Sequence, residues 1–188
     1  LRGDIRAGEH RLVFPSTGNY GIGGAWVGPR MGFDSTVVLP EEMSAERFER
    51  IRGYGAEIIA TPGSESNVKE IYDEVKRLKK RPEIRVLNQF EAFGNYRFHH
   101  GVTGPAAEQV SKQLGFGGRV AAFVSAMGSA GTIAAGDYLK TAYNTAIVGL
   151  EPVQCPTLYN VGYGAHRIEG IGDKHVTWIH NVMNMDLL

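Results

Sequence analysis

Short apolar runs alternate with amphipathic segments along the chain. The most regular amphipathic segment starts at Ser66 and stops before Pro82, and its apolar residues are spaced three or four apart. These residues are Val68, Ile71, Val75 and Leu78. Because that spacing places apolar side chains on one face of a helix, the segment predicts an amphipathic helix. Further helices are predicted over residues 19–32, from Ser44 to 53–55, over 106–114 and over 131–140.

Apolar runs bounded by turn residues predict strands. They lie at residues 11–14, 35–40, 56–61, 84–87, 119–127 and 145–150. Strands that alternate with helices of about 10 to 15 residues indicate βαβ crossovers and a mostly parallel sheet. The sequence therefore predicts an α/β fold with two Rossmann-like open parallel sheets flanked by helices. Residues 89–103 show little periodicity and separate the two sheets, and we expect the functional site in the cleft between them.

The composition limits the classes of partner. The chain has 188 residues, 43% of them apolar, which suits one or two folded domains. Lys plus Arg and Asp plus Glu number 20 each, so the formal net charge is zero and no bulk field attracts nucleic acid or an anionic membrane surface. No apolar stretch approaches the roughly 20 residues that a membrane-spanning helix needs. We therefore expect a small-molecule substrate and neither nucleic acid nor membrane as partner.

Cysteine and histidine usage argues against disulfides and metals. The single cysteine, Cys155, excludes an internal disulfide and a cysteine-rich zinc site, and it fits a reducing, cytoplasmic compartment. The histidines follow no metal-ligand spacing on a predicted helix, so we predict no metal site. They include His99, His100, His166, His175 and His180.

The ends of the chain indicate a segment of a longer protein. The chain begins at Leu1 without an initiator methionine, has no apolar targeting segment there, and stops at Leu188. We therefore expect truncation at both ends.

Two glycine-containing loops carry the strongest chemical signal. One is Pro15-Ser16-Thr17-Gly18-Asn19-Tyr20-Gly21 and the other is Met127-Gly128-Ser129-Ala130-Gly131-Thr132. Each follows an apolar strand and opens a helix, so its backbone N–H groups point toward an anion such as a phosphate or a carboxylate. A nucleotide-binding Rossmann oxidoreductase is one alternative. It is disfavoured because G-x-G-x-x-G is absent and because Glu151 at a strand end is followed by Pro152.

The order of several motifs resembles that of the fold-type II pyridoxal 5′-phosphate-dependent enzymes, the family of the tryptophan synthase β subunit and cysteine synthase. The first loop is similar to the family's asparagine loop, with Tyr20 where threonine is usual, and the second is similar to its phosphate loop. Other matching segments are Leu39-Pro40-Glu41-Glu42-Met43-Ser44-Ala45-Glu46-Arg47, Gly55-Ala56-Glu57-Ile58, Asn88-Gln89-Phe90, Thr103-Gly104-Pro105, Glu151-Pro152 and Ile168-Glu169-Gly170-Ile171-Gly172. Within the family the chain is most similar to cysteine synthase-like proteins.

The resemblance implies pyridoxal 5′-phosphate as cofactor and gives roles to residues of both loops. The implied cofactor-binding residues are Asn19, at the phenolic oxygen, and Gly128, Ser129, Ala130, Gly131 and Thr132, at the phosphate. The implied substrate-binding residues are Ser16, Thr17, Gly18, Gln89 and Gly170. Interpretations without a ligand are a helix cap for Asn19, a strand end for Gln89, and tight turns for Gly170 and the second loop. His99 matches a family histidine that we expect to make structural hydrogen bonds.

The resemblance also implies an activity, a domain division and an assembly state. The activity is β-elimination or β-replacement on a small amino acid, a carbon–oxygen or carbon–sulfur lyase or transferase reaction of amino-acid metabolism, in a homodimer. Residues 1–20 and 98–188 would form parts of the larger cofactor-binding domain, and 21–97 a smaller, mobile domain. The family's Schiff-base lysine precedes the asparagine loop and is not in this chain, so the catalytic residue is unknown. A non-catalytic scaffold subunit that keeps a cofactor-shaped cleft is the alternative.

Overall fold

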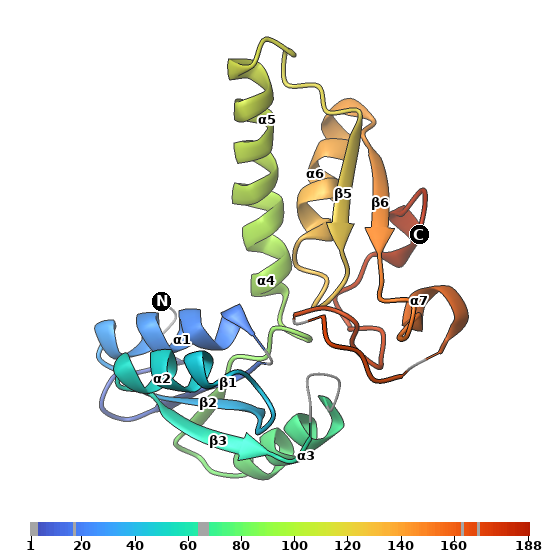
Figure 1. The fold of residues 1–188 in the computed structure, drawn as a ribbon. Coiled ribbons are helices and arrows are strands. Elements are labelled where there is room, and N and C mark those ends of the chain that lie inside the picture. The colour runs from blue at the N-terminus through green and yellow to red at the C-terminus, as the bar shows by residue number, and fades with distance from the viewer. Residues whose placement is uncertain (1–3, 17, 64–67, 163, 169) are drawn as a thin grey trace. The chain divides into compact units, whose positions relative to one another are not determined.

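The chain forms two compact units, Leu1–Gln89 and Phe90–Leu188. The computed structural model in Figure 1 describes residues 4–16, 18–63, 68–162, 164–168 and 170–188. The predicted grouping of residues 1–20 with 98–188 differs from this division. The first strand lies inside the first unit because it is hydrogen-bonded to two other strands of that unit. The mobility of the smaller domain stays a prediction.

The first unit contains a four-stranded parallel sheet with strand order β3-β2-β1-β4. Its strands are β1 (Arg11–Pro15), β2 (Asp34–Pro40), β3 (Glu57–Thr61) and β4 (Ile84–Val86). Val13 of β1 is in register with Thr36 of β2 and with Val86 of β4. The carboxyl ends of β1 and β4 therefore meet at one edge of the sheet, where ligands of open α/β sheets bind.

Three helices cover this sheet: α1 (Asn19–Arg30), α2 (Ala45–Gly53) and α3 (Val68–Leu78). Alternate residues of the central strands point to opposite faces, which is the period of two expected of a strand. One set of strand residues, Leu12, Phe14, Val37 and Leu39, packs with Ala25 of α1 and Ile51 of α2. The other set, which includes Val13 and Val38, packs with α3 through Ile71, Val75 and Leu78. Both predicted faces of the sheet are thus buried, and the predicted α/β class is confirmed.

Small residues bring α1 close to the sheet. A Cβ atom on Gly24 would lie 2.5 Å from ring atoms of Phe14, and one on Gly28 would lie 1.9 Å from Ser35 Oγ. A side chain at Gly24 would require the Phe14 ring to shift, and one at Gly28 would require the Ser35 hydroxyl to rotate away. The middle and the last turn of α1 therefore lie close against β1 and β2.

The second unit contains a two-stranded parallel sheet of β5 (Ala122–Ala126) and β6 (Ala146–Leu150), joined by α6 (Ile133–Tyr143). Two short helices follow, α7 (Thr157–Asn160) and the 3₁₀ helix η2 (Val182–Asn184). The core between α6 and the sheet includes Met127, Ala130, Ile133, Ile147 and Ile179. Among the described residues, no helix combines the length and the apolar character needed to cross a membrane.

A continuous helical run packs beside α6 and was missed by the sequence prediction for residues 89–103. It comprises α4 (Phe93–Phe98), the π-helix η1 (His99–Thr103) and α5 (Gly104–Gln113), and Figure 1 shows it as one long column. Gly94 and Gly101 lower its intrinsic helix propensity. Tertiary contacts with α6 compensate, and one is a 2.8 Å hydrogen bond from the Tyr96 hydroxyl to the Asp137 carboxylate. Such contacts join residues that are distant in the sequence, so a local pattern cannot predict them.

Glu108 joins α5 to α6 through a polar cluster. Its carboxylate forms an ion pair with Lys112 and accepts hydrogen bonds from the hydroxyls of Tyr138 and Tyr143. The Lys112 ammonium, followed by the two hydroxyls, lowers the pKa of Glu108 from 4.5 to about 2. The cluster therefore favours the ionised carboxylate in the folded chain.

Acid should weaken this junction. Because the pKa of Glu108 is lower in the folded than in the unfolded chain, the stabilisation is complete above pH 4.5 and is lost as the pH falls toward 2. We expect the thermal unfolding temperature to fall less steeply over this range in Glu108→Gln than in the wild type. Glu46→Gln, at an exposed pair with Arg50, is the control and should keep the wild-type slope. Equal slopes in Glu108→Gln and the wild type would contradict the assignment.

Candidate functional site

The loop between β5 and α6 presents a row of unused backbone donors. Its first residue is tied to the sheet, because Met127 N donates to Leu150 O over 2.9 Å and Gly172 N donates to Met127 O over 3.1 Å. Ala130 adopts a left-handed conformation with φ of 68°. Within the described residues, the N–H groups of residues 128–132 donate to no acceptor. Since they precede the positive end of α6, the loop is suited to an anion.

Two glycines of this loop leave no room for a side chain. A Cβ atom on Gly128 would lie 2.6 Å from the carbonyl oxygen of Gly170, and one on Gly131 would lie 2.2 Å from Asn95 Oδ1 and 2.8 Å from His99 Cδ2. The loop is therefore packed from both sides, by residues 170–172 and by the helical run of α4 and η1. Its backbone path is fixed without a ligand, which is the preorganisation that an anion site needs.

Polar side chains hold the loop's hydroxyl residues. Asn95 Nδ2 donates to Ser129 Oγ over 3.0 Å, and Ser125 Oγ donates to Thr132 Oγ1 over 2.7 Å. Thr177 Oγ1 also donates to the Ser129 carbonyl over 3.4 Å. A hydroxyl that accepts one hydrogen bond still has its own proton to donate. Ser129 and Thr132 can therefore add two O–H donors to the row of N–H groups.

His99 lies behind the loop and makes the structural hydrogen bond that the sequence predicted. Its Nδ1 is 2.9 Å from Thr103 Oγ1 across one turn of η1. Burial lowers the pKa of His99, which favours the neutral imidazole near pH 7. The π-helix places this histidine against Gly131, and π-helices are frequent at functional sites.

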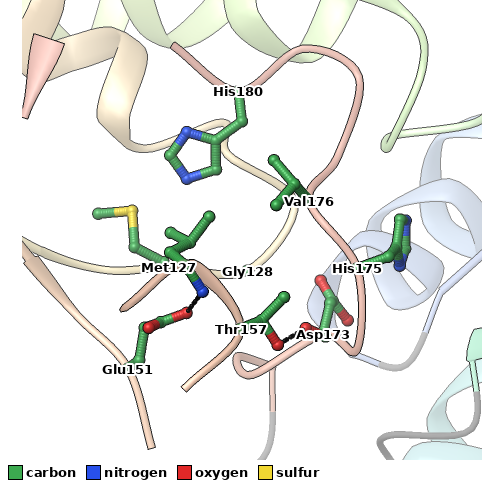
Figure 2. A pocket seen from close by; sticks show the side chains of 9 residues that line it. Met127, Gly128, Glu151, Thr157, Asp173, His175, Val176 and His180 are labelled. Carbon is green, nitrogen blue, oxygen red and sulfur yellow. Dashed lines mark hydrogen bonds between the residues drawn. The ribbon is translucent and has the colours of Figure 1, made fainter. Parts of the chain in front are cut away.

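Gly128 also lines a cavity whose wall includes several titratable side chains (Figure 2). Its lining residues are Met127, Gly128, Glu151, Thr157, Leu158, Asp173, His175, Val176 and His180. Burial lowers the pKa of His175 and of His180, so neither imidazole is a strong source of positive charge near pH 7. Glu151 caps α7, because its two carboxylate oxygens accept from Leu158 N at 2.8 Å and Tyr159 N at 3.1 Å. Attraction for an anion beside this cavity comes from the backbone of the loop.

The first glycine-containing loop is built around Ser16. This side chain is buried, and its Oγ accepts hydrogen bonds from Gly18 N at 3.0 Å and Gly21 N at 2.9 Å while it lies 3.2 Å from Gly18 O. The Ser16 hydroxyl is thus fully used in shaping the loop and the first turn of α1. Thr17 lies outside the described residues.

Asn19 and Gln89 flank this loop in the same unit. Asn19 is the first residue of α1 and is exposed, and the N-cap position belongs to Gly18, so the Asn19 side chain does not cap the helix. Gln89 follows the end of β4, and its Nε2 lies 3.5 Å from the carbonyl oxygen of Pro15. The structure thus brings Ser16, Gly18, Asn19 and Gln89 together at the carboxyl ends of β1 and β4.

The other predicted site residues gather in the second unit. Gly170 lies against Gly128 and has φ of 87°, a conformation that favours glycine. It therefore belongs with the loop of residues 128–132. The supporting residues Asn95, Ser125 and Thr177 were not predicted. Asn95 lies in the segment predicted to be irregular, and no periodic pattern marks Thr177.

Comparison with known proteins identifies the family. A family model described as pyridoxal-phosphate-dependent enzyme matches residues 2–185. A cysteine synthase of Staphylococcus aureus strain N315 is 36% identical over 172 residues, which are 90% of this chain and 54% of that protein. Cysteine synthase B of Pseudomonas aeruginosa is 32% identical over an alignment of 196 positions, and the match covers 97% of this chain and 63% of that protein. The chain thus spans little more than half the length of these curated relatives.

Comparison with solved structures leads to the same family. A hydrogen sulfide-producing enzyme from Fusobacterium nucleatum has a TM-score of 0.87 and 28% identity, covering 99% of this chain and 56% of that one. An O-acetylserine-dependent cystathionine β-synthase from Helicobacter pylori has a TM-score of 0.86 and 27% identity, covering 98% and 59%. Together with the family model, these similarities confirm the predicted resemblance. The chain belongs to the pyridoxal-phosphate-dependent enzymes, in their fold-type II, cysteine synthase-like branch.

Proposed function

We propose that the protein containing this chain uses pyridoxal 5′-phosphate to catalyse β-replacement or β-elimination on a small amino acid, as a cysteine synthase-like enzyme. One observation carries the proposal. In the part of the chain that the structure describes, the N–H groups of residues 128–132 meet no acceptor at the start of α6, in a loop where Gly128 and Gly131 leave no space for a Cβ atom. A dianionic phosphate matches this row in charge and in its need for close backbone approach.

The residues of the second unit fit the phosphate of the cofactor. Gly128, Ser129, Ala130, Gly131 and Thr132 would hold it with their backbone N–H groups and with the free protons of the two hydroxyls. When bound, the cofactor supplies a ring that withdraws electrons from the substrate α-carbon. Gly170, packed against Gly128, would lie beside the substrate.

The residues of the first unit fit a carboxylate and the cofactor ring. Asn19 is exposed and would donate its amide to the phenolic oxygen of the cofactor. Thr17, Gly18 and Gln89 would bind the substrate carboxylate, helped by the positive end of α1. Ser16 would act by holding the loop in shape, since its hydroxyl is already used within the loop.

The nucleophile is not assigned to a lysine of this chain. Lysines at 69, 76, 79, 80, 112, 140 and 174 lie in other sequence contexts than the family's lysine motif. We propose that a lysine outside the chain carries the cofactor and moves the α-proton. The chain itself supplies binding, orientation and the exclusion of water around the reacting atoms.

Cofactor spectroscopy tests the proposed function. The protein that contains this chain, loaded with pyridoxal 5′-phosphate, should change its visible absorption when O-acetyl-L-serine is added. Borohydride reduction before intact-mass measurement should add the mass of one reduced cofactor to the polypeptide. Cofactor binding without either change would contradict the enzymatic proposal and support the alternative, a non-catalytic subunit that keeps the fold.

Two finer features are also proposals. Location in the cytoplasm is supported by the lone, buried Cys155, which forms no disulfide. Assembly as a homodimer is supported by the family resemblance alone. Sedimentation of the loaded protein at several concentrations would measure the assembly state.

A further inference from the structure

Tyr20 connects the two sides of the proposed carboxylate site. It is the second residue of α1, immediately after Asn19, and its hydroxyl donates to the carbonyl oxygen of Leu87 over 2.8 Å. Leu87 lies just past the end of β4 and two residues before Gln89. A single side chain therefore spans from the loop of residues 16–19 to the segment of residues 87–89.

The position of Tyr20 is well determined by its surroundings. Its ring packs edge-on against Phe14, with centroids 5.9 Å apart and an interplanar angle of 68°. Leu87 is anchored in turn, because its N–H donates to Val13 O over 2.9 Å. Burial raises the pKa of Tyr20 to about 12, so the hydroxyl keeps the proton that it donates. Both ends of the Tyr20–Leu87 hydrogen bond are thus held by contacts with β1, the Tyr20 ring by Phe14 and Leu87 by Val13.

The bridge supplements a weak direct contact. The hydrogen bond from Gln89 Nε2 to Pro15 O is 3.5 Å long, at the limit of such interactions. The Tyr20 hydrogen bond to the Leu87 carbonyl, at 2.8 Å, has an ordinary hydrogen-bond length. The residue pairing of β1 with β4 ends at Val86, and beyond it the Leu87 N–H and the Tyr20 hydroxyl tie Leu87 to β1 and to α1.

We infer that Tyr20 is a positioning residue for the substrate: its hydroxyl fixes residues 87–89 against the loop of residues 16–19, so that Gln89 and the start of α1 hold a carboxylate between them. This inference rests on the proposed function. Tyr20 itself does not contact the carboxylate, because its hydroxyl is directed to Leu87.

Tyr20→Phe tests the bridge, since it removes one hydroxyl and keeps the ring on Phe14. Tyr54→Phe, in the same unit, is the matched control. In the cofactor-loaded protein we expect amide hydrogen exchange at residues 87–89 to rise about 2- to 10-fold in Tyr20→Phe, the effect of one lost hydrogen bond. Affinity for L-serine should fall by a similar factor. Affinity for pyridoxal 5′-phosphate and for L-serinamide, which lacks the carboxylate, should match the wild type.

The outcomes separate the inference from the proposed function. Faster exchange with unchanged L-serine affinity would make Tyr20 a structural residue only and overturn the inference, as would unchanged exchange. Equal losses for L-serine and L-serinamide would also overturn it, because the effect would not involve the carboxylate. A loaded wild-type protein that binds no L-serine would contradict the proposed function itself, and the carboxylate role of Tyr20 with it.

Discussion

Replacing Gly128 by alanine is expected to lower the affinity for pyridoxal 5′-phosphate by about 5- to 100-fold while the protein stays folded. The added Cβ atom would lie 2.6 Å from the Gly170 carbonyl oxygen, a backbone atom that cannot rotate away. Overpacking of this kind costs about 1–3 kcal/mol, and relief requires the loop or residues 170–172 to move. Either movement misdirects the N–H groups that would meet the phosphate. Equilibrium titration followed by cofactor absorbance measures the loss.

Two comparisons make this expectation specific. Pyridoxal, which lacks the phosphate, should bind wild type and Gly128→Ala with nearly equal affinity, so that the advantage of the phosphorylated cofactor shrinks in the variant. Gly94→Ala, in α4, is the matched control: nothing lies within 4 Å of the added Cβ atom, and cofactor affinity should be unchanged. Equal losses for both ligands would indicate general damage, and no loss in Gly128→Ala would place the phosphate elsewhere.

Asp137→Ala is expected to lower the free energy of unfolding by about 1.5–3 kcal/mol, the range for hydrogen bonds to a charged group. Asp137 lies on α6 with only 4% of its surface exposed. Its carboxylate accepts hydrogen bonds from Tyr96 at 2.8 Å, from Asn181 at 3.1 Å and from Asn184. These donors come from α4 and from the C-terminal segment. Removing the carboxylate leaves each of them without this acceptor, so the contacts that join α4 and the C-terminal segment to α6 are lost together.

Urea unfolding of the wild type and variants measures this loss. Asp73→Ala is the control, because Asp73 pairs with Lys69 on the exposed face of α3 and its removal should lower the free energy of unfolding far less. A loss in Asp137→Ala no larger than in Asp73→Ala would show that the network does not hold the second unit together. A large loss would also explain how the helical run behind the phosphate loop persists despite its glycines.

The positions of helices and strands could be predicted from the local sequence where the apolar residues of a segment are the ones that become buried. The spacing of Val68, Ile71, Val75 and Leu78 predicts α3, and all four side chains are buried. The run before Pro40 predicts β2, which is likewise buried. In such segments the spacing of the apolar residues shows which side chains face the core.

The support of the site could not be predicted in the same way. The segment with α4 and η1 is poor in helix-forming residues and depends on bonds such as Tyr96 to Asp137, which join positions 41 residues apart. Ser16 was predicted to bind substrate, but no sequence pattern shows that its hydroxyl already accepts two N–H groups. Motif order located both loops, and only the three-dimensional contacts show what holds them.

The central claim is that the N–H groups of residues 128–132 hold the cofactor phosphate. A crystal structure of the protein containing this chain, loaded with pyridoxal 5′-phosphate, tests it most directly. We predict phosphate oxygens within about 2.7–3.2 Å of backbone nitrogens in this loop. A cofactor bound with its phosphate away from the loop, and water on these N–H groups, would contradict the claim.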